Sequence, residues 1–250
     1  MAFTLFGSLC PVDYHFMRET SVTASAEAAI WDGTEDTSWY YREHDVIVSE
    51  NGERIAIFNI RTAEELAGLA KLVRNGNSMK NTMINLVSDV TLNDTTNFDN
   101  WDEQPPANNW TAIGAVPIEA PNVNVVMTTQ PECRNTVFAG MFNGNGHTIS
   151  GMYSLHHNYA GLFARTSGII TNVIVKDSYI QCINTQKVES GDTALWEACA
   201  GGITAICDRG VISHCEFDGK IFASGLNQVG YGTHGSFAGG IVGKFSDDEN

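Results

Sequence analysis

The chain has 250 residues, enough for one large domain or two small ones. Its formal net charge is −15, and so acidic a surface repels phosphate backbones, so we expect no nucleic acid among its partners. No stretch of 18 or more apolar residues occurs, so no membrane span is predicted. Charged residues make up only 17% of the chain and glycine is frequent, which favours β-structure with many turns.

Residues 1–26 differ in character from the rest. Ala24-Ser25-Ala26, directly before Glu27, has the A-x-A pattern of a signal-peptide cleavage site. A basic segment at the start is missing, and PVDYHFMRET is too polar for the apolar segment of such a peptide. Two interpretations stay open: a signal peptide whose start is truncated, which we favour, and an N-terminus that is disordered or forms a strand. The first places the protein outside the cell or at its surface.

Residues 27–80 predict a hairpin followed by a helix. Asn51-Gly52 between two apolar runs indicates a hairpin turn. In RTAEELAGLAKLVRNG, Thr62 and Glu65 have the spacing of a capping box, and Gly76 ends the helix. The apolar face is formed by Leu66, Leu69, Ala70 and Val73. We expect this helix to cap the open end of a sheet.

Residues 81–250 predict strands and loops with an internal repeat. An Ala-Gly box recurs four times, at 138–142, 159–163, 199–203 and 237–241, with an offset of 21 residues between the first two. Apolar residues after the boxes are spaced i, i+3, i+5, as if the chain turned a corner between two short strands. These features predict an all-β fold, a right-handed parallel β-helix with about 21 residues per lap and an N-terminal capping helix. Its inward positions would be Ile149, Met152, Ile170, Val173, Val175, Ile212, Cys215 and Phe217.

The glycine-rich stretch FNGNGH lies within this repeat. It does not match the G-x-G-x-x-G that precedes a helix, and no lysine follows as in a phosphate-binding loop. His147 falls at a corner, where we expect a solvent-facing residue. Cys182 and Cys199 flank an insertion at 183–198, and two interpretations stay open for them: a disulfide that closes the insertion, or two free thiols.

A family resemblance follows from the order of these segments. TAEELAGLAKLV, INLVSDVTL, WTAIG, FAGMFNGNGHTISGM and AGGITAICDRGVISHC resemble, over about residues 55–245, bacterial cell-surface proteins that carry GLUG-type repeats. Adhesin-like proteins and the non-catalytic parts of immunoglobulin A1 peptidases belong to this class. The resemblance implies a right-handed parallel β-helix and extracellular display. It supplies no catalytic residues, since H-E-x-x-H is absent. The last box ends shortly before Asn250, so we expect further domains in a longer parent chain.

Two functions from different classes are open. The first is a non-catalytic module for adhesion that binds host or microbial glycans or proteins through loop insertions, with Trp101, Trp110 and Trp196 as contact aromatics. Each tryptophan has a plain alternative as a packed lid.

The second function is a polysaccharide-processing lyase or hydrolase on the same scaffold, with Asp177, Glu216 and Asp218 as candidate acids. Here the alternative is an ion pair between Lys176 and Asp218.

A cofactor is not predicted, although one loop resembles a cation site. Asp99, Asn100, Asp102 and Glu103 supply oxygen atoms of the kind that calcium prefers. The spacing of D-N-W-D-E does not match an EF-hand, and the alternative is an acidic loop in contact with water.

Overall fold

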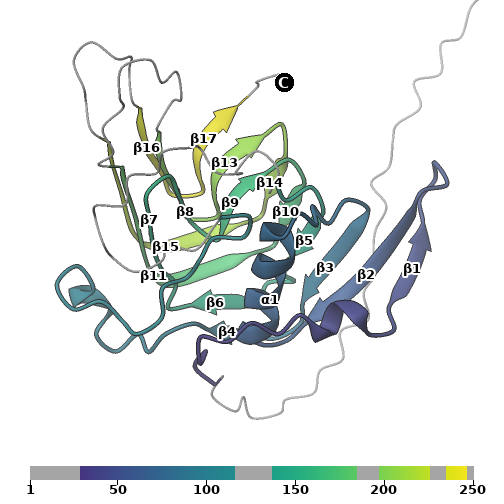
Figure 1. The fold of residues 1–250 in the computed structure, drawn as a ribbon, viewed down its shortest axis with the longest axis horizontal. Helices are drawn as coiled ribbons and strands as arrows, with labels where there is room; N and C mark the ends of the chain where they lie inside the picture. Colours follow the sequence, from purple (N-terminus) through teal and green to yellow (C-terminus); the bar gives the residue numbers. More distant parts are fainter. Residues whose placement is uncertain (1–28, 116–136, 185–196, 226–234, 247–250) are drawn as a thin grey trace, which may run out of the picture.

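The computed structural model describes residues 29–115, 137–184, 197–225 and 235–246. It has a mixed α/β fold, in which several sheets of mostly parallel strands surround a common core and accompany one α-helix (Figure 1). The signal-peptide prediction at 1–26 and most of the insertion at 183–198 lie outside the described residues.

The largest sheet has six strands in the order β1-β2-β3-β5-β10-β14. Within the described part of the chain, β1 with β2 is the single antiparallel pair. The strands are β1 (Asp45–Val48), β2 (Arg54–Ile60), β3 (Thr82–Leu86), β5 (Met141–Asn143), β10 (Ile169–Thr171) and β14 (Val211–Ser213).

Three smaller sheets complete the β-structure. One has the order β15-β11-β6-β4 with β7 also paired to β11, and the other two have the orders β16-β12-β8 and β17-β13-β9. Their strands are β4 (Val90–Thr91), β6 (Thr148–Ser150), β7 (Tyr153–His156), β8 (Tyr159–Ala160), β9 (Phe163–Thr166), β11 (Ile174–Asn184), β12 (Ala198–Gly201), β13 (Thr204–Asp208), β15 (Glu216–Gly225), β16 (Ser236–Gly239) and β17 (Val242–Ser246).

The predicted hairpin and helix are both present. Gly52 has φ +81° in the turn between β1 and β2, a conformation that glycine adopts without strain. Helix α1 (Ala63–Arg74) begins after Thr62, whose hydroxyl accepts a hydrogen bond from the Glu65 amide at 3.2 Å. The helix ends at Arg74, two residues before Gly76, which has φ +96°.

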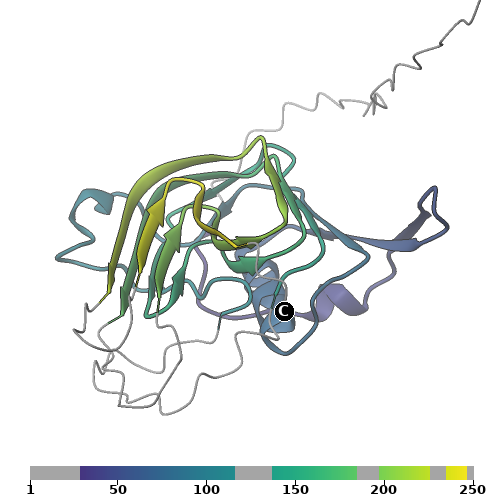
Figure 2. The same ribbon diagram turned by 90° about the horizontal axis from the view of Figure 1, so that it is seen from above.

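Helix α1 connects the parallel strands β2 and β3, so its place differs from the predicted one. Its apolar face, with Leu66 and Leu69 fully buried, packs into the core that the sheets share. Seen from above, α1 lies inside the outline of the sheets (Figure 2). The outer edge of the six-stranded sheet is instead β1, all four of whose residues are exposed. The helix therefore does not cap the first edge of the sheet.

The core contains the residues that the spacing i, i+3, i+5 placed inward. Ile149, Met152, Ile170, Val173 and Val175 are fully buried, which confirms the prediction for them. The remaining three, Ile212, Cys215 and Phe217, are half-buried against the same cluster.

The predicted all-β fold, a right-handed parallel β-helix with about 21 residues per lap, is wrong, because the described residues form several sheets and a helix in a mixed α/β fold. Ile149 pairs with Val175, 26 residues further on, and Ile170 pairs with Phe142 on one side and Ile212 on the other. The first two Ala-Gly boxes do not pair with each other, since Phe138 bridges Thr166 and Tyr159 pairs with Cys199. Similar short sequences that belong to different sheets produced the apparent period. The connections between strands differ in kind and length, because they include a hairpin, a helix and insertions of unequal length.

Two smaller structures lie beside the sheets. They are the 3-10 helices η1 (Ser38–Tyr41), which precedes β1, and η2 (Phe98–Asn100), which lies in the insertion at 93–109. Among the described residues, no helix is long and apolar enough to cross a membrane.

Candidate functional site

A groove of about 400 Å³ lies at the edge of the six-stranded sheet, between η1 and the paired strands β1 and β2. We call it the edge groove. Its lining is rich in charged and aromatic side chains, which are the usual specificity elements of binding sites. It is formed by Trp39, Arg42, Glu43, His44, Asp45, Ile57, Phe58, Asn59 and Arg61.

The groove is open because β1 is shorter than β2. Asp45, the first residue of β1, pairs with Ile57, and Asn59 lies beyond this last pair. The backbone amide of Ala56 donates a hydrogen bond to the carbonyl of Asn81, and the carbonyl of Ile60 accepts one from the amide of Val87. The backbone groups of the even-numbered residues of β2 therefore face β3. Since successive residues of a strand alternate, the N–H and C=O of Asn59 face the groove. They offer a ligand one backbone donor and one backbone acceptor.

Aromatic rings form the inner wall of the groove. Phe58 on β2 is buried and stacks on Tyr40 of η1, with ring centroids 5.2 Å apart. Trp39 meets Phe58 edge to face at 5.5 Å, and the His44 imidazole lies 4.4 Å from the Phe58 ring. These contacts hold η1 against β2. The packed rings therefore support the groove from beneath, and the surface that the groove presents is mostly polar.

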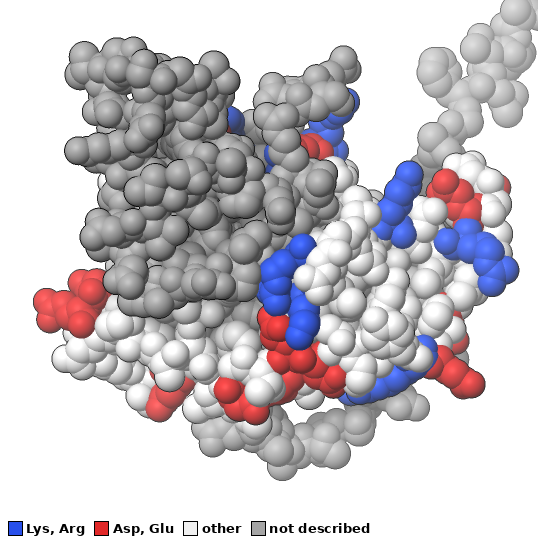
Figure 3. Space-filling model, viewed as in Figure 1, with Lys and Arg blue, Asp and Glu red and all other residues white. Residues whose placement is uncertain are grey.

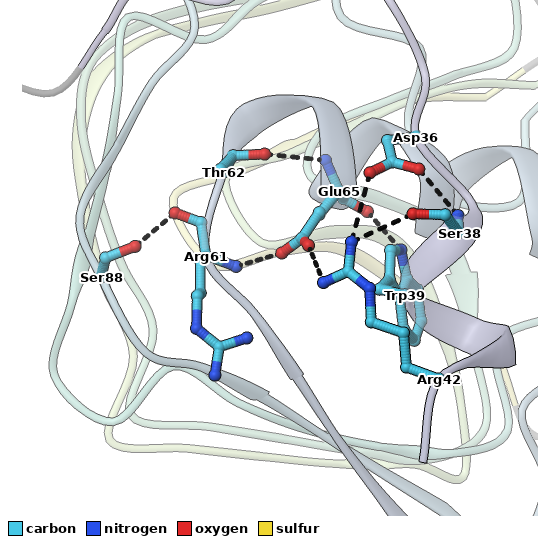
Figure 4. A network of polar contacts seen from close by, with 8 residues as sticks. All are labelled: Asp36, Ser38, Trp39, Arg42, Arg61, Thr62, Glu65 and Ser88. Carbon is cyan, nitrogen blue, oxygen red and sulfur yellow. Dashed lines mark hydrogen bonds and ion pairs between the residues drawn. The ribbon is translucent and has the colours of Figure 1, made fainter. Parts of the chain in front are cut away.

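A buried carboxylate ties the parts of the wall together (Figure 4). Glu65 accepts a hydrogen bond from the Arg42 guanidinium at 2.9 Å and another from the Arg61 amide at 2.7 Å. Its backbone carbonyl accepts from the Trp39 indole at 3.0 Å. The capping box thus differs from the predicted one, because the Glu65 side chain binds the Arg61 amide rather than the amide of Thr62. One side chain thereby joins η1, the end of β2 and the first turn of α1.

Arg42 is held on its other side by the 3-10 helix. Its guanidinium donates to the Ser38 hydroxyl at 3.0 Å and lies 3.7 Å from the Asp36 carboxylate. Hydrogen bonds from Ser38, followed by the charge of Arg42, lower the pKa of Asp36 below its ordinary value. Arg42 is thus largely committed to the wall of the groove.

Arg61 has the opposite character. Its side chain extends away from the network in Figure 4, and no hydrogen bond or ion pair joins its guanidinium to another described residue. A guanidinium has five N–H donors, so Arg61 offers the groove an unused set. Glu43 and Asp45 supply carboxylate acceptors nearby. Basic and acidic side chains lie side by side on the molecular face in Figure 3 as well, so this face carries no field of a single sign.

The predicted contact tryptophans are placed differently from what a sugar-binding loop requires. Trp101 is only 2% exposed and packs edge to face on Tyr153, with ring centroids 6.1 Å apart. Trp110 is also 2% exposed, and its indole donates to the carbonyl of Leu162. Trp110 is part of the main core and Trp101 of a separate cluster with Tyr153 and Tyr179, so neither ring presents a face to solvent. Trp196 lies outside the described residues.

The acidic loop near Trp101 does not assemble a cation site. Asp99 is 91% exposed, and its carboxylate lies 3.8 Å from the ammonium group of Lys220. Across the described ranges, no three His, Cys, Asp or Glu side chains lie close enough together to hold a metal ion. Asp102 and Glu103 are exposed as well.

The candidate acids of the enzyme hypothesis lie on the neighbouring strands β11 and β15. Asp177, Glu216 and Asp218 are all exposed and line none of the edge groove. The pairing of β11 with β15 is irregular between Val175 and Ser178, and Asp177 has φ +47° there. A β-bulge accounts for both observations. No ion pair between Lys176 and Asp218 is found in the part of the chain that the structure describes.

Both cysteines that flank the second insertion are free, buried thiols. Burial raises the pKa of the Cys199 thiol to about 12. Burial, followed by the charge of the neighbouring Cys199, raises the pKa of the Cys182 thiol as well. Such thiols are inert at neutral pH. His147 is half-exposed, with its Nδ1 3.2 Å from the Asp89 carboxylate, in keeping with a corner residue.

Sequence reasoning missed the edge groove. Its signals were present, since WYYREHD places two charges and a histidine directly after an aromatic cluster and before β1. No local pattern shows, however, that Arg42 reaches Glu65 or that β1 stops short of Asn59.

Comparisons of the chain with family models, curated proteins and solved structures found no match.

Proposed function

We propose that this protein is a non-catalytic binding module that recognises a glycan or a protein, with the edge groove as its contact site. The observation that carries the proposal is the chemistry of the groove. The guanidinium of Arg61 and the backbone N–H and C=O of Asn59 have no partner among the described residues, and the carboxylates of Glu43 and Asp45 lie in the same groove, over packed aromatic rings.

This combination suits a ligand with many hydroxyl or amide groups. A hydroxyl both donates and accepts a hydrogen bond, and the groove offers partners of both kinds within about 400 Å³. The network around Glu65 fixes the wall before a ligand arrives, which lowers the entropy lost on binding. A site built for binding needs no more than this arrangement.

An extracellular location is part of the proposal. It is supported by the A-x-A pattern at Ala24-Ser25-Ala26 and by the resemblance to surface proteins with GLUG-type repeats. A surface protein that displays a rigid groove is suited to adhesion. Mass spectrometry of secreted and surface-shaved protein from the native host tests this part: an N-terminus near Glu27 supports it, and intact Met1 in the cytosol contradicts it.

A binding screen tests the function. The purified chain is applied to glycan and mucin arrays together with Arg61→Ala and Arg54→Ala. Arg54 is an exposed arginine at the start of β2, whereas Arg61 directly follows the end of this strand; Arg54 lies outside the groove, so it controls for the loss of one positive charge. We expect at least one ligand to be bound, with affinity about tenfold weaker in Arg61→Ala and unchanged in Arg54→Ala.

The same ligands are assayed for new reducing ends and unsaturated uronates, with Asp177→Asn and Asp218→Asn alongside. Product release that these two substitutions abolish would replace the binding module with a polysaccharide-processing enzyme. Equal weakening by Arg61→Ala and Arg54→Ala would remove the groove from the proposal.

A further inference from the structure

Two rows of side chains cross the outer face of the six-stranded sheet, perpendicular to its strands. Residues that pair in register across β2, β3, β5, β10 and β14 have matching chemistry. The apolar row consists of Ile57, Met83, Met141, Ile169 and Val211. The polar row consists of Asn59, Asn85, Asn143, Thr171 and Ser213. Between them, the row from Phe58 to Ile212 points inward to the core.

Three of the ten residues in the two rows are exposed and the other seven are half-buried, so the outer face is partly open to solvent. Ile169 is 40% exposed and Val211 is 54% exposed, and Asn59 at the other end of the polar row is exposed too. None of the ten residues in the two rows carries a charge, on a chain with a net charge of −15. Both rows begin in the edge groove, because Ile57 and Asn59 also line it.

From this face we infer that the ligand is an uncharged polysaccharide, which lies across the strands with its C–H surfaces on the apolar row and its hydroxyls on the polar row. The inference rests on the proposed function and names its substrate class. It also extends the contact from the groove across the face of the sheet.

The repeat of the surface favours a polymer of like units over a protein partner. Neighbouring strands of a sheet are about 4.8 Å apart, so the rows present the same pair of groups at equal intervals. This interval is of the order of the length of one pyranose ring. A chain of identical sugars meets the same chemistry at each step, whereas a protein surface has no such translational repeat. The rows carry no positive charge, and in the groove the carboxylates of Glu43 and Asp45 accompany Arg61, so an acidic polysaccharide is disfavoured.

The polar row also stabilises the sheet, and this role leaves capacity for a ligand. The Asn85 amide donates to Asn59 at 3.2 Å, and the Ser213 hydroxyl donates to Thr171 at 3.1 Å. Each side-chain amide has two donors and an acceptor with two lone pairs, and each hydroxyl has two lone pairs. These two bonds fix the ends of the row and leave groups there free to bind hydroxyls, whereas Asn143 in the middle donates to Asn145 and accepts from Asn172 and from the Asn145 amide.

Affinity electrophoresis tests the inference. The chain is run in native gels that contain dextran, galactomannan or mixed-linkage β-glucan, and in a gel that contains polygalacturonate. Val211→Lys places a charge on the exposed end of the apolar row, and Thr171→Val removes a hydroxyl from the polar row. Val48→Lys is the matched control, because Val48 is an exposed strand valine of the same sheet, 63% exposed, outside both rows.

We expect retardation by at least one of the neutral polysaccharides and none by polygalacturonate. Val211→Lys and Thr171→Val should weaken it about tenfold or more, while Val48→Lys binds as the wild type. Val211→Lys should leave the melting temperature unchanged, and Thr171→Val, which also removes the acceptor of the Ser213 hydrogen bond, should lower it only slightly. Retardation by polygalacturonate alone, binding of a protein alone, or an unaffected Val211→Lys would overturn the inference. In those cases the proposed function survives if Arg61→Ala, and not Arg54→Ala, still weakens binding of whatever ligand is found, and it fails if Arg61→Ala has no such effect.

Discussion

The guanidinium of Arg42 and the carboxylate of Glu65 meet at 2.9 Å, where η1 crosses the start of α1. Glu65 is almost completely buried with its side chain 6% exposed, whereas that of Arg42 is 51% exposed. Water reaches one partner and not the other, so the pair anchors the surface side chain to the core. Because the same carboxylate accepts from the Arg61 amide, it determines where both walls of the edge groove lie.

Glu65→Gln should destabilise the fold and loosen the groove. The amide keeps the shape of the side chain, but it weakens two charge-assisted hydrogen bonds. We expect a loss of about 1–2 kcal/mol, below the 3–5 kcal/mol of a fully buried pair because Arg42 remains hydrated. Urea unfolding measures the change. Glu64→Gln in the same helical turn is the control, and it should cost only a few tenths of a kcal/mol. Equal losses in the two variants would show that Glu65 has no special role.

Gly68→Ala should be destabilising although it lies in a helix. A Cβ at this position would be 1.9 Å from the backbone carbonyl oxygen of Asp36, so α1 and the segment before η1 would have to separate. The gain of up to about 1 kcal/mol in helix propensity is smaller than the cost of this overlap, and we expect a net loss of about 1–3 kcal/mol. Gly240→Ala, with no atom within 4 Å of its Cβ, should stay within about 0.5 kcal/mol of the wild type in thermal unfolding. A more stable Gly68→Ala would refute the close approach.

Local features of the fold were predictable and long-range ones were not. Asn51-Gly52 and Thr62 identify a turn and a helix start because their chemistry acts over a few residues. The inward positions of Ile170 and Val173 follow from spacing alone. The prediction of a 21-residue period was wrong because the strands that pair depend on the length and path of the insertions between them. The spacing of apolar residues within a strand carries no information on that path.

The candidate site shows the same limit. Trp101 is a lid because Tyr153, far away in the sequence, lies beneath it, so its burial could not be read from the loop. The edge groove exists because β1 ends two residues short of Asn59 and because Arg42 finds Glu65, 23 residues on. Both are consequences of tertiary packing.

Val173→Asp tests the shared core. Val173 is fully buried, and an unpaired carboxylate there has no water and no partner. We expect a loss of at least about 3 kcal/mol and a clear fall in melting temperature. Val48→Asp, on the exposed strand β1, should leave the melting temperature nearly unchanged. An unchanged melting temperature for Val173→Asp would mean that this residue does not face the core.

Stability should fall in alkaline solution because of the buried thiols. Burial raises the pKa of Cys199 to about 12 from an ordinary value of 9.0, and it raises that of Cys182 as well. A raised folded pKa means that the contribution to stability is complete below pH 9 and is lost as the pH rises, since the unfolded thiols ionise first. The loss is up to about 1.4 kcal/mol per pH unit for each thiol.

Urea unfolding at about pH 8 and about pH 10.5 measures this loss. Cys199→Ala should flatten the dependence relative to the wild type. Burial also raises the pKa of Tyr153 and Tyr179, so part of the slope above pH 10 should remain in the variant. A slope identical to that of the wild type would show that Cys199 is not buried in the folded protein.

Hydrogen–deuterium exchange with and without the ligand from the binding screen shows whether the edge groove is the binding site. In the free protein the Asn59 amide faces the groove without a partner, so it should exchange rapidly. With ligand bound, we predict protection in peptides that cover 39–45 and 57–61, the two segments that line the edge groove. Protection confined to 93–109, or to the bulge at Asp177 and the neighbouring strand around Asp218, with no change at 57–61, would contradict this assignment of the site.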